Sequence, residues 1–168
     1  NKGATLYDIK DGVLNLEFHT KMNTMGKDVL EGINYAIDIC EKQYNGLVIA
    51  NEADYFSAGA DLGTVFMLAG NRDFDTIEKS IDAFQKTTMR VRYSSVPVVV
   101  ATSGLALGGA CELSMHADAV QAHNETYMGL VELGAGLIPA GGGTKETVLR
   151  VSSEYSKGDP EFNKLMES

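Results

Sequence analysis

Short apolar runs alternate along the chain with longer segments in which apolar residues recur every three or four positions. Three runs are typical of strands: "GVLNLEF" at 12–18, "GLVIAN" at 46–51 and "VPVVVATSG" at 96–104. The third is continuously apolar, as in strands buried on both faces. Residues 25–42 instead place their apolar side chains on one helical face, namely Val29, Leu30, Ile33, Ile37 and Cys40. This alternation predicts βαβ units.

The remainder of the chain continues the same alternation. We expect helices at 61–70, 76–93, 108–118 and 142–150, and strands at 119–123 and 127–133. In the helix expected at 76–93, the residues that fall on one face are Ile77, Ile81, Phe84 and Thr88. The pattern predicts one α/β core over residues 1–150. Residues 151–168 are polar, and we expect a linker or the start of a terminal helical region.

Composition limits the classes of partner. The chain has 168 residues, enough for one domain with a core, and a net charge of −9 that argues against nucleic acid or anionic membranes. No apolar run approaches the roughly 18 residues of a membrane span, and no signal peptide is visible, so we expect a cytoplasmic protein. Cys40 and Cys111 lie far apart in apolar patterns, which favours reduced, buried thiols over a disulfide.

Small residues follow two of the expected strands. "FSAGADL" at 56–62 comes after the second strand, and "LALGGACEL" at 105–113 comes after the third and leads into a helix. Ligands bind at the carboxyl ends of strands in open α/β sheets, where small side chains expose backbone N–H groups. Two such donors converging on one point would form an oxyanion hole. The alternative, which glycine content alone favours, is that the glycines only permit tight turns and packing.

Two glutamates lie close to these turns in sequence. Glu112 follows Gly109 by three residues, about one helical turn. Glu132 lies in the apolar stretch "GLVELGAGLIP", where a carboxylate needs a partner or a raised pKa. Two carboxyl groups at one site can hold a water and divide acid and base roles. Taken singly, each is more often a solvated residue.

Other chemistries fit poorly. Pro139 stands where a dinucleotide-binding fingerprint requires its third glycine, and no P-loop is present. The histidines and cysteines show no metal-ligand spacing, so we expect no metal site. We expect His116 to be a buried or capping histidine and Asp61 to cap the helix that follows it.

Taken together, "FSAGADL", "GLALGGACELSMHADAV" and "GLVELGAGLIPAGGGT" resemble the crotonase family, the enoyl-CoA hydratase/isomerase group. The resemblance covers about residues 10–150 and includes the early Asn-containing turn "NTM" at 23–25. It implies the crotonase-like (ClpP/crotonase) α/β fold, a spiral of ββα units. The resemblance implies that the backbone N–H groups of Ala60 and Gly109 form the oxyanion hole. The other substrate-binding residues that it implies are Ala58, Gly59, Asp61 and Gly108.

The activity that the resemblance implies is the hydration of trans-2-enoyl-CoA thioesters in fatty-acid β-oxidation. Glu112 would activate water and Glu132 would protonate the α carbon. No metal or redox cofactor is implied, since coenzyme A arrives as part of the substrate. Two alternatives stay open: an enoyl-CoA isomerase using Glu132 alone, and a catalytically silent acyl-CoA-binding or assembly module. The presence of both glutamates favours the hydratase.

The chain also departs from the family. The motif "VELGAGLIPAGGG" resembles the hydratase modules of bacterial bifunctional chains that also carry a 3-hydroxyacyl-CoA dehydrogenase. "NEADY" at 51–55 is acidic where many members carry a basic residue facing coenzyme A, and Ala110 replaces a frequent third glycine. The resemblance implies further helices that build oligomers and cover the substrate, and we expect that C-terminal helical part to be missing or truncated here. We therefore expect a trimer-based homo-oligomer or part of a larger chain, an exposed apolar patch, and poor activity alone.

Overall fold

Five strands form the main sheet of the structure, a computed structural model that describes residues 2–154. Their order is β1-β2-β3-β4-β6, with β1 antiparallel to β2 and all other neighbours parallel. The strands are β1 (Ala4–Asp8), β2 (Val13–Phe18), β3 (Gly46–Ala50), β4 (Val98–Thr102) and β6 (Ala119–Ala122). Sequence patterning missed β1, an edge strand in which only Ala4 is buried and alternation is therefore weak.

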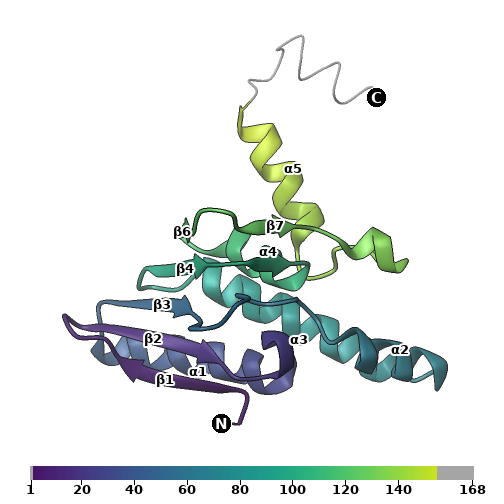
Figure 1. Cartoon of the computed structure of the whole chain (residues 1–168), viewed down its shortest axis with the longest axis horizontal. Helices are drawn as coiled ribbons and strands as arrows, with labels where there is room; N and C mark the ends of the chain where they lie inside the picture. Colours follow the sequence, from purple (N-terminus) through teal and green to yellow (C-terminus); the bar gives the residue numbers. More distant parts are fainter. Residues whose placement is uncertain (1, 155–168) are drawn as a thin grey trace.

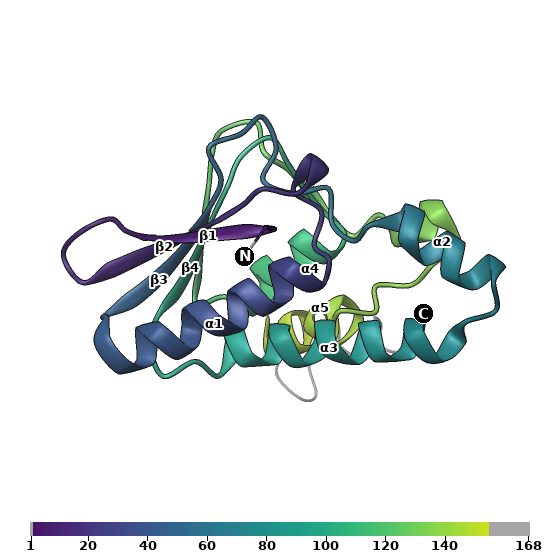
Figure 2. The same ribbon diagram turned by 90° about the horizontal axis from the view of Figure 1, so that it is seen from below.

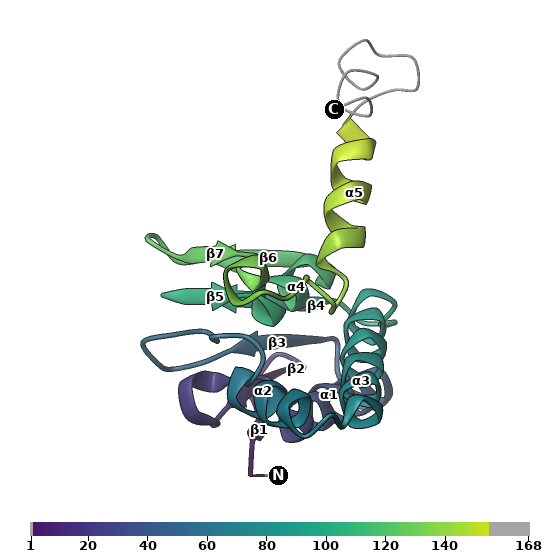
Figure 3. The same cartoon turned by 90° about the vertical axis from the view of Figure 1, so that its right-hand side faces the viewer.

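A second, smaller sheet receives the chain directly after β4. It pairs β5 (Leu105–Leu107) in parallel with β7 (Tyr127–Gly129), and Ser57 forms a further parallel bridge to Ala106. Figure 3 shows β5 beside β4 and β7 beside β6. The strand expected at 96–104 therefore ends early, because Gly104, with a φ of +56°, turns the chain from one sheet into the other.

Helices α1 (Lys27–Gln43) and α3 (Phe74–Arg92) run side by side along the main sheet (Figure 2). The apolar face expected in α1 is buried throughout. In α3 only the C-terminal half is buried, and Ile81 is 37% exposed, so the face expected there is wrong over its first half. That half runs past the sheet, and the packed neighbour there is α2 (Leu62–Gly70), which buries no residue itself.

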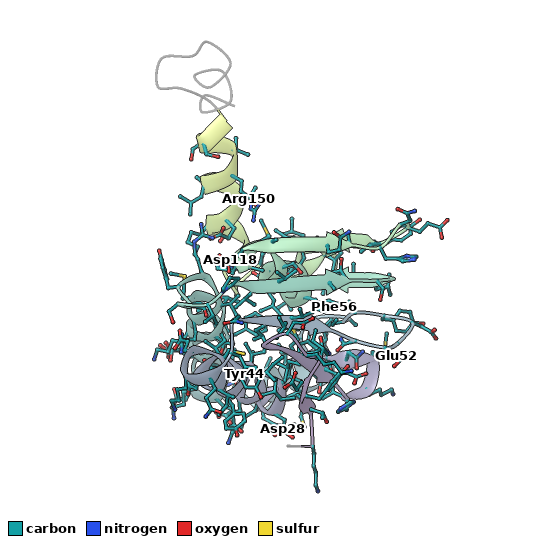
Figure 4. The ribbon with its side chains drawn as sticks, turned by 90° about the vertical axis from the view of Figure 1, so that its left-hand side faces the viewer. Asp28, Tyr44, Glu52, Phe56, Asp118 and Arg150 are labelled. Carbon is teal, nitrogen blue, oxygen red and sulfur yellow. The ribbon has the colours of Figure 1, made fainter. Side chains whose placement is uncertain are left out.

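Phe56 joins the two sheets from within the core (Figure 4). Its side chain is fully buried, and its ring centroid lies 6.0 Å from that of Phe18 on β2. The backbone N–H of Phe56 donates to the Ser103 carbonyl at 2.8 Å, and its carbonyl accepts from the side-chain amide of Asn51. The small-residue turn that follows Phe56 is therefore fixed at its first residue by packing and hydrogen bonds together.

The last described part of the chain contains α4 (Gly109–His116), a 3₁₀ turn η2 (Glu132–Ala135) and α5 (Gly143–Glu154). Helix α5 stands out from the body of the molecule (Figure 1), and Arg150 ties it back by donating to the Met115 carbonyl at 2.8 Å. The helix was expected to end at 150 but continues to Glu154, into the segment expected to be a linker or the start of a terminal helical region. The rest of that segment, 155–168, lies outside the described residues.

The strand expected at 127–133 is wrong beyond Gly129, where β7 ends. Pairing stops at Leu107 opposite Gly129, because the partner strand β5 ends there and Gly108 turns the chain into α4. Residues beyond β7 therefore have no partner strand, and Glu132 begins η2 instead. Gly136, with a φ of +72°, ends that turn.

Cys40 and Cys111 are both buried and unpaired, as expected. Within residues 2–154, no helix has both the length and the apolar character needed to cross a membrane.

Removing the ring of Phe56 should reveal how much its packing contributes to the free energy of unfolding. Phe56→Ala is expected to lower the free energy of unfolding by about 3–5 kcal/mol, the usual cost of a fully buried phenylalanine. Urea titration followed by circular dichroism measures it. Tyr93→Ala, at a side chain 72% exposed, is the control and should change stability by less than about 0.5 kcal/mol. Equal effects of the two substitutions would contradict the assignment of Phe56 to the core.

Candidate active site

The two small-residue turns touch through their backbones. A Cβ on Gly59 would lie 2.5 Å from the Leu107 carbonyl oxygen and 3.1 Å from the Gly109 nitrogen. Gly59 also has a φ of +85°, which other residues adopt at a cost. Glycine is therefore required at position 59 both by its conformation and by the approach of the other turn.

A third segment holds the first turn in place. The Met25 N–H donates to the Gly59 carbonyl at 2.8 Å, and the Ala58 N–H donates to the Met22 carbonyl at 3.1 Å. The side-chain amide of Asn23 donates to the Tyr55 carbonyl at 3.0 Å. These are the residues of the Asn-containing turn singled out in the sequence, and their role here is to position the 58–60 backbone.

Two backbone amides, those of Ala60 and Gly109, lie next to each other at the contact between the turns. The Ala60 nitrogen is 3.7 Å from where a Cβ of Gly109 would lie. Neither amide donates a hydrogen bond to another residue in the described part of the chain. Gly109 begins α4, and the first N–H groups of a helix have no partner within it. Adjacent unpaired donors of this kind can bind a developing negative charge on oxygen.

Glu112 is buried one turn into α4, with 3% of its surface exposed. Its Oε1 accepts a 2.8 Å hydrogen bond from the N–H of Gly143, the first residue of α5. A Cβ on Gly141 would lie 2.5 Å from its Oε2, and one on Gly143 would lie 3.0 Å from its Oε1. The carboxylate thus occupies the space that side chains at these two glycines would fill.

Burial raises the pKa of Glu112 above its ordinary value. The hydrogen bond from the Gly143 N–H partly offsets that rise, and the charge of nearby Glu132 adds to it. Because the second carboxylate acts on the first in this way, the two belong to one electrostatic site.

Glu132 lies at the start of α4, although it comes from η2. Its Oε1 is 3.0 Å from where a Cβ of Gly108 would lie, so the absence of a side chain there admits the carboxylate. Gly108 has a φ of +52°, and its N–H donates to the Gly129 carbonyl at 2.8 Å. The Oε2 of Glu132 is buried and has no hydrogen-bond partner among the residues described. Such an oxygen is available to a ligand or a water.

Asp61 caps α2, as expected. Its carboxylate accepts from the N–H of Gly63 at 3.1 Å and from the Thr64 hydroxyl at 2.7 Å. The Thr64 hydrogen bond is the main reason that the pKa of Asp61 lies below its ordinary value. The backbone of Ala58 and Gly59, rather than the Asp61 carboxylate, therefore faces the second turn.

Sequence reasoning missed Phe84 and the close packing of the 141–143 glycines. A Cβ on Gly109 would lie 2.7 Å from Phe84 Cζ, and one on Gly141 would lie 2.6 Å from its Cε1. The ring thus separates the start of α4 from the turn before α5. The run of three glycines after Pro139 was the available signal, because three successive positions without side chains indicate close approach.

The sequence matches the model of a known protein family over most of its length. The model of the family described as "Enoyl-CoA hydratase/isomerase" matches residues 8–156. The chain belongs to the enoyl-CoA hydratase/isomerase family. The resemblance seen in the sequence motifs is thereby confirmed, over nearly the same range.

Two curated relatives from Bacillus subtilis extend this result. A protein named "Probable 3-hydroxyacyl-CoA dehydrogenase" is 40% identical over 168 residues, which is 100% of this chain and 21% of that one. A protein named "Probable enoyl-CoA hydratase" is 32% identical over 125 residues, 73% of this chain and 47% of that one. The chain therefore spans about a fifth of the first relative and about half of the second.

Solved structures of the family share the fold. An enoyl-CoA hydratase from a Polaromonas species superimposes with a TM-score of 0.81 at 22% identity, covering 85% of this chain and 56% of the other. At this identity the likeness concerns the fold alone. It confirms the crotonase-like α/β architecture expected from the motifs.

Replacing Glu112 by Gln should give a pH-dependent gain in stability. Since the pKa of Glu112 is raised by folding, its favourable contribution is present below its ordinary pKa and is lost as the pH rises through the folded pKa. Gln keeps an acceptor for Gly143 but cannot ionise. The melting temperature of Glu112→Gln relative to the unsubstituted chain should therefore rise steadily between pH 4 and pH 8.

Glu41→Gln is the control with the opposite sign. Hydrogen bonds from Arg90 and then Ser95 lower the pKa of Glu41 to about 2, so its contribution is present above its ordinary pKa and is lost as the pH falls. Its relative melting temperature should fall as the pH rises from about 2 to the ordinary value of 4.5, and should stay level above it. Differential scanning fluorimetry measures both trends. Parallel trends for the two variants would show that burial does not control the pKa of Glu112.

Proposed function

We propose that this chain carries an enoyl-CoA hydratase site, which adds water to trans-2-enoyl-CoA thioesters of fatty-acid oxidation. The observation that carries the proposal is the meeting of two unpaired backbone amides, at Ala60 and Gly109, with two carboxylates, Glu112 and Glu132, at one end of α4. Family membership supports the same reaction class.

The two amides would bind the thioester oxygen. Attack at the β carbon moves negative charge onto that oxygen, and donors placed beforehand stabilise it without reorganisation. In other enzymes each such donor contributes about 10²–10³ in turnover. Ala58, Gly59 and Gly108 contribute by carrying little or no side chain, so that the thioester can reach the main chain.

The two carboxylates would divide the proton transfers. Ionised Glu112 takes a proton from water as the hydroxyl oxygen bonds to the β carbon. Glu132 would deliver a proton to the α carbon, and one proton passing from Glu112 to Glu132 restores the site. A base whose pKa lies above its ordinary value is a better proton acceptor once ionised, which suits Glu112 to the first step.

We propose that coenzyme A enters only as part of the substrate. Adding water across a double bond needs no external oxidant or reductant, so the reaction calls for no redox cofactor. Within residues 2–154, no group of three or more His, Cys, Asp or Glu side chains is placed to hold a metal ion.

We also propose that the site works within a larger assembly, either a homo-oligomer or a longer chain with a dehydrogenase part. Several large apolar side chains outside the core are exposed, and Leu133 on η2 is 78% exposed. The others include Phe66, Met67, Ile138 and Val148. Apolar surface of this kind favours association. The alignment with a fifth of a protein named for dehydrogenase activity agrees with the second arrangement.

Two Glu→Gln substitutions test the proposed function. Glu112→Gln and Glu132→Gln should each reduce hydration of crotonyl-CoA by about 10²–10⁴, the usual worth of general acid–base catalysis. The substrate's loss of absorbance at the enoyl thioester band measures turnover. Glu78→Gln, on the exposed face of α3, is the matched control and should leave the rate unchanged.

Double-bond isomerisation separates the alternatives. An isomerase that uses Glu132 alone would keep its rate in Glu112→Gln and lose it in Glu132→Gln. Normal hydration by both variants would exclude the carboxylates as catalysts and favour a silent acyl-CoA-binding module. The same assays on a longer chain that includes the native downstream sequence would show whether the assembly is needed.

A further inference from the structure

A group of charged and polar side chains lies next to the Glu112 backbone carbonyl, and two of its members, His116 and Glu146, are buried. Its centre is Glu146 on α5, whose side chain is 2% exposed. Glu146 Oε2 accepts from Arg92 of α3 at 2.8 Å, and Lys145 Nζ lies 3.0 Å from its Oε1. His116 of α4 completes the group, with Nε2 at 3.5 Å from the same oxygen. The group therefore joins three helices at one point.

His116 connects this group to the helix that carries Glu112. Its Nδ1 lies 2.7 Å from the Glu112 backbone carbonyl oxygen, an acceptor, so Nδ1 carries a proton. In the neutral ring Nε2 then accepts, and Lys145 Nζ is 3.2 Å away as donor. Burial lowers the pKa of His116, and the charge of Lys145 lowers it further, which agrees with a neutral ring.

The same group holds the turn that reaches the Glu112 carboxylate. A Cβ on Gly142 would lie 2.7 Å from His116 Cε1, so the turn rests directly on the imidazole ring. The Glu146 N–H donates to the Gly142 carbonyl at 2.9 Å. The next residue, Gly143, donates its N–H to Glu112 Oε1. The His116 ring thus supports the turn directly, and the Glu146 side chain supports it through α5, whose first turn it anchors to Arg92.

A purely structural contact between these helices would not need a buried carboxylate, whose removal from water costs free energy. Apolar residues of similar volume often replace buried ion pairs without loss of stability. Here Oε1 of Glu146 is buried and is held by the charge of Lys145, whose Nζ lies 3.0 Å away, rather than by a well-aligned hydrogen bond among the described residues. Burial would raise the pKa of Glu146, but the positive charges of Lys145 and Arg92 outweigh it and place the pKa below its ordinary value. A fixed charge at this point orients its neighbours more strictly than apolar packing does.

We propose that Glu146 and His116 are positioning residues that hold the Gly143 N–H on the Glu112 carboxylate. The geometric part stands by itself. Its kinetic consequence rests on the proposed function, in which Glu112 is the base.

The test of the geometric part needs no activity. Because the Gly143 N–H donates to Glu112 Oε1, its amide shifts in ¹H–¹⁵N spectra report the protonation of Glu112. In Glu146→Gln the Gly143 titration should become smaller in amplitude, and its midpoint should move to higher pH, since the hydrogen bond that favours the ionised form is weakened. Glu41→Gln removes another arginine-paired carboxylate, bonded to Arg90 at 2.7 Å, and should leave the Gly143 titration unchanged.

The kinetic part uses crotonyl-CoA hydration. Glu146→Gln should lower kcat by about ten- to hundredfold with little change in KM, since small misplacements of a catalytic group cost this much. The acidic limb of its kcat profile should move to higher pH, as the Gly143 titration does. An unchanged Gly143 titration in a folded Glu146→Gln protein would overturn the proposal whatever the kinetics show.

A second variant guards against a folding defect. His116→Asn can keep a donor on the Glu112 carbonyl, as Asn34 does on the Leu30 carbonyl in α1 at 2.8 Å, but it loses the Nε2 contacts. It should show an intermediate titration shift and keep more activity than His116→Ala. Equal effects of Asn and Ala would contradict the role assigned to Nδ1. If the unsubstituted longer chain, with its native downstream sequence, lacks hydratase activity while the Gly143 titration shifts in Glu146→Gln, the proposed function is refuted and the positioning stands.

Discussion

The close contact between two backbone turns is the constraint on which the site depends. Gly59 lies against the Leu107 carbonyl and the Gly109 nitrogen at distances that no side chain would permit. Everything that brings these turns together serves that contact: the bridge from Ser57 to Ala106, the burial of Phe56, and the bonds from Met25 and Ala58. The two sheets meet so that main-chain atoms, rather than side chains, face each other.

Glu112 sits in an environment that opposes its ionisation. Glu112 is buried and near a second carboxylate, with one backbone N–H as its direct hydrogen-bond donor, so its pKa is raised. The chain surrounds that carboxylate with glycines at 141 and 143, which bring a helix N-terminus to it without bringing bulk. Stability and reactivity therefore conflict at this one residue, as is common at catalytic sites.

The sequence predicted the order of elements where burial produced a clear period. The α1 face and strands β2, β3 and β4 followed from apolar spacing, and the small-residue motifs led to the family. Strands β1 and β5 were missed because three to five residues give too little pattern. Glu132 was placed on a strand because nothing local shows where a partner strand ends. The contacts of Phe84, His116 and Glu146 depend on helices distant in sequence, which spacing cannot reveal.

The outward projection of α5 has a mechanical consequence. The helix begins at the Gly143 amide, is held one turn later at Glu146 and again by Arg150 at the Met115 carbonyl, and projects from the body of the molecule beyond that point (Figure 1). With a rise of 1.5 Å per residue, the two contacts lie about 6 Å apart along the helix, and the far end lies about 6 Å beyond the second. Two contacts on one rigid helix resist tilting, so a force on the projecting end reaches the Gly143 amide and Glu112 only after one of these contacts breaks.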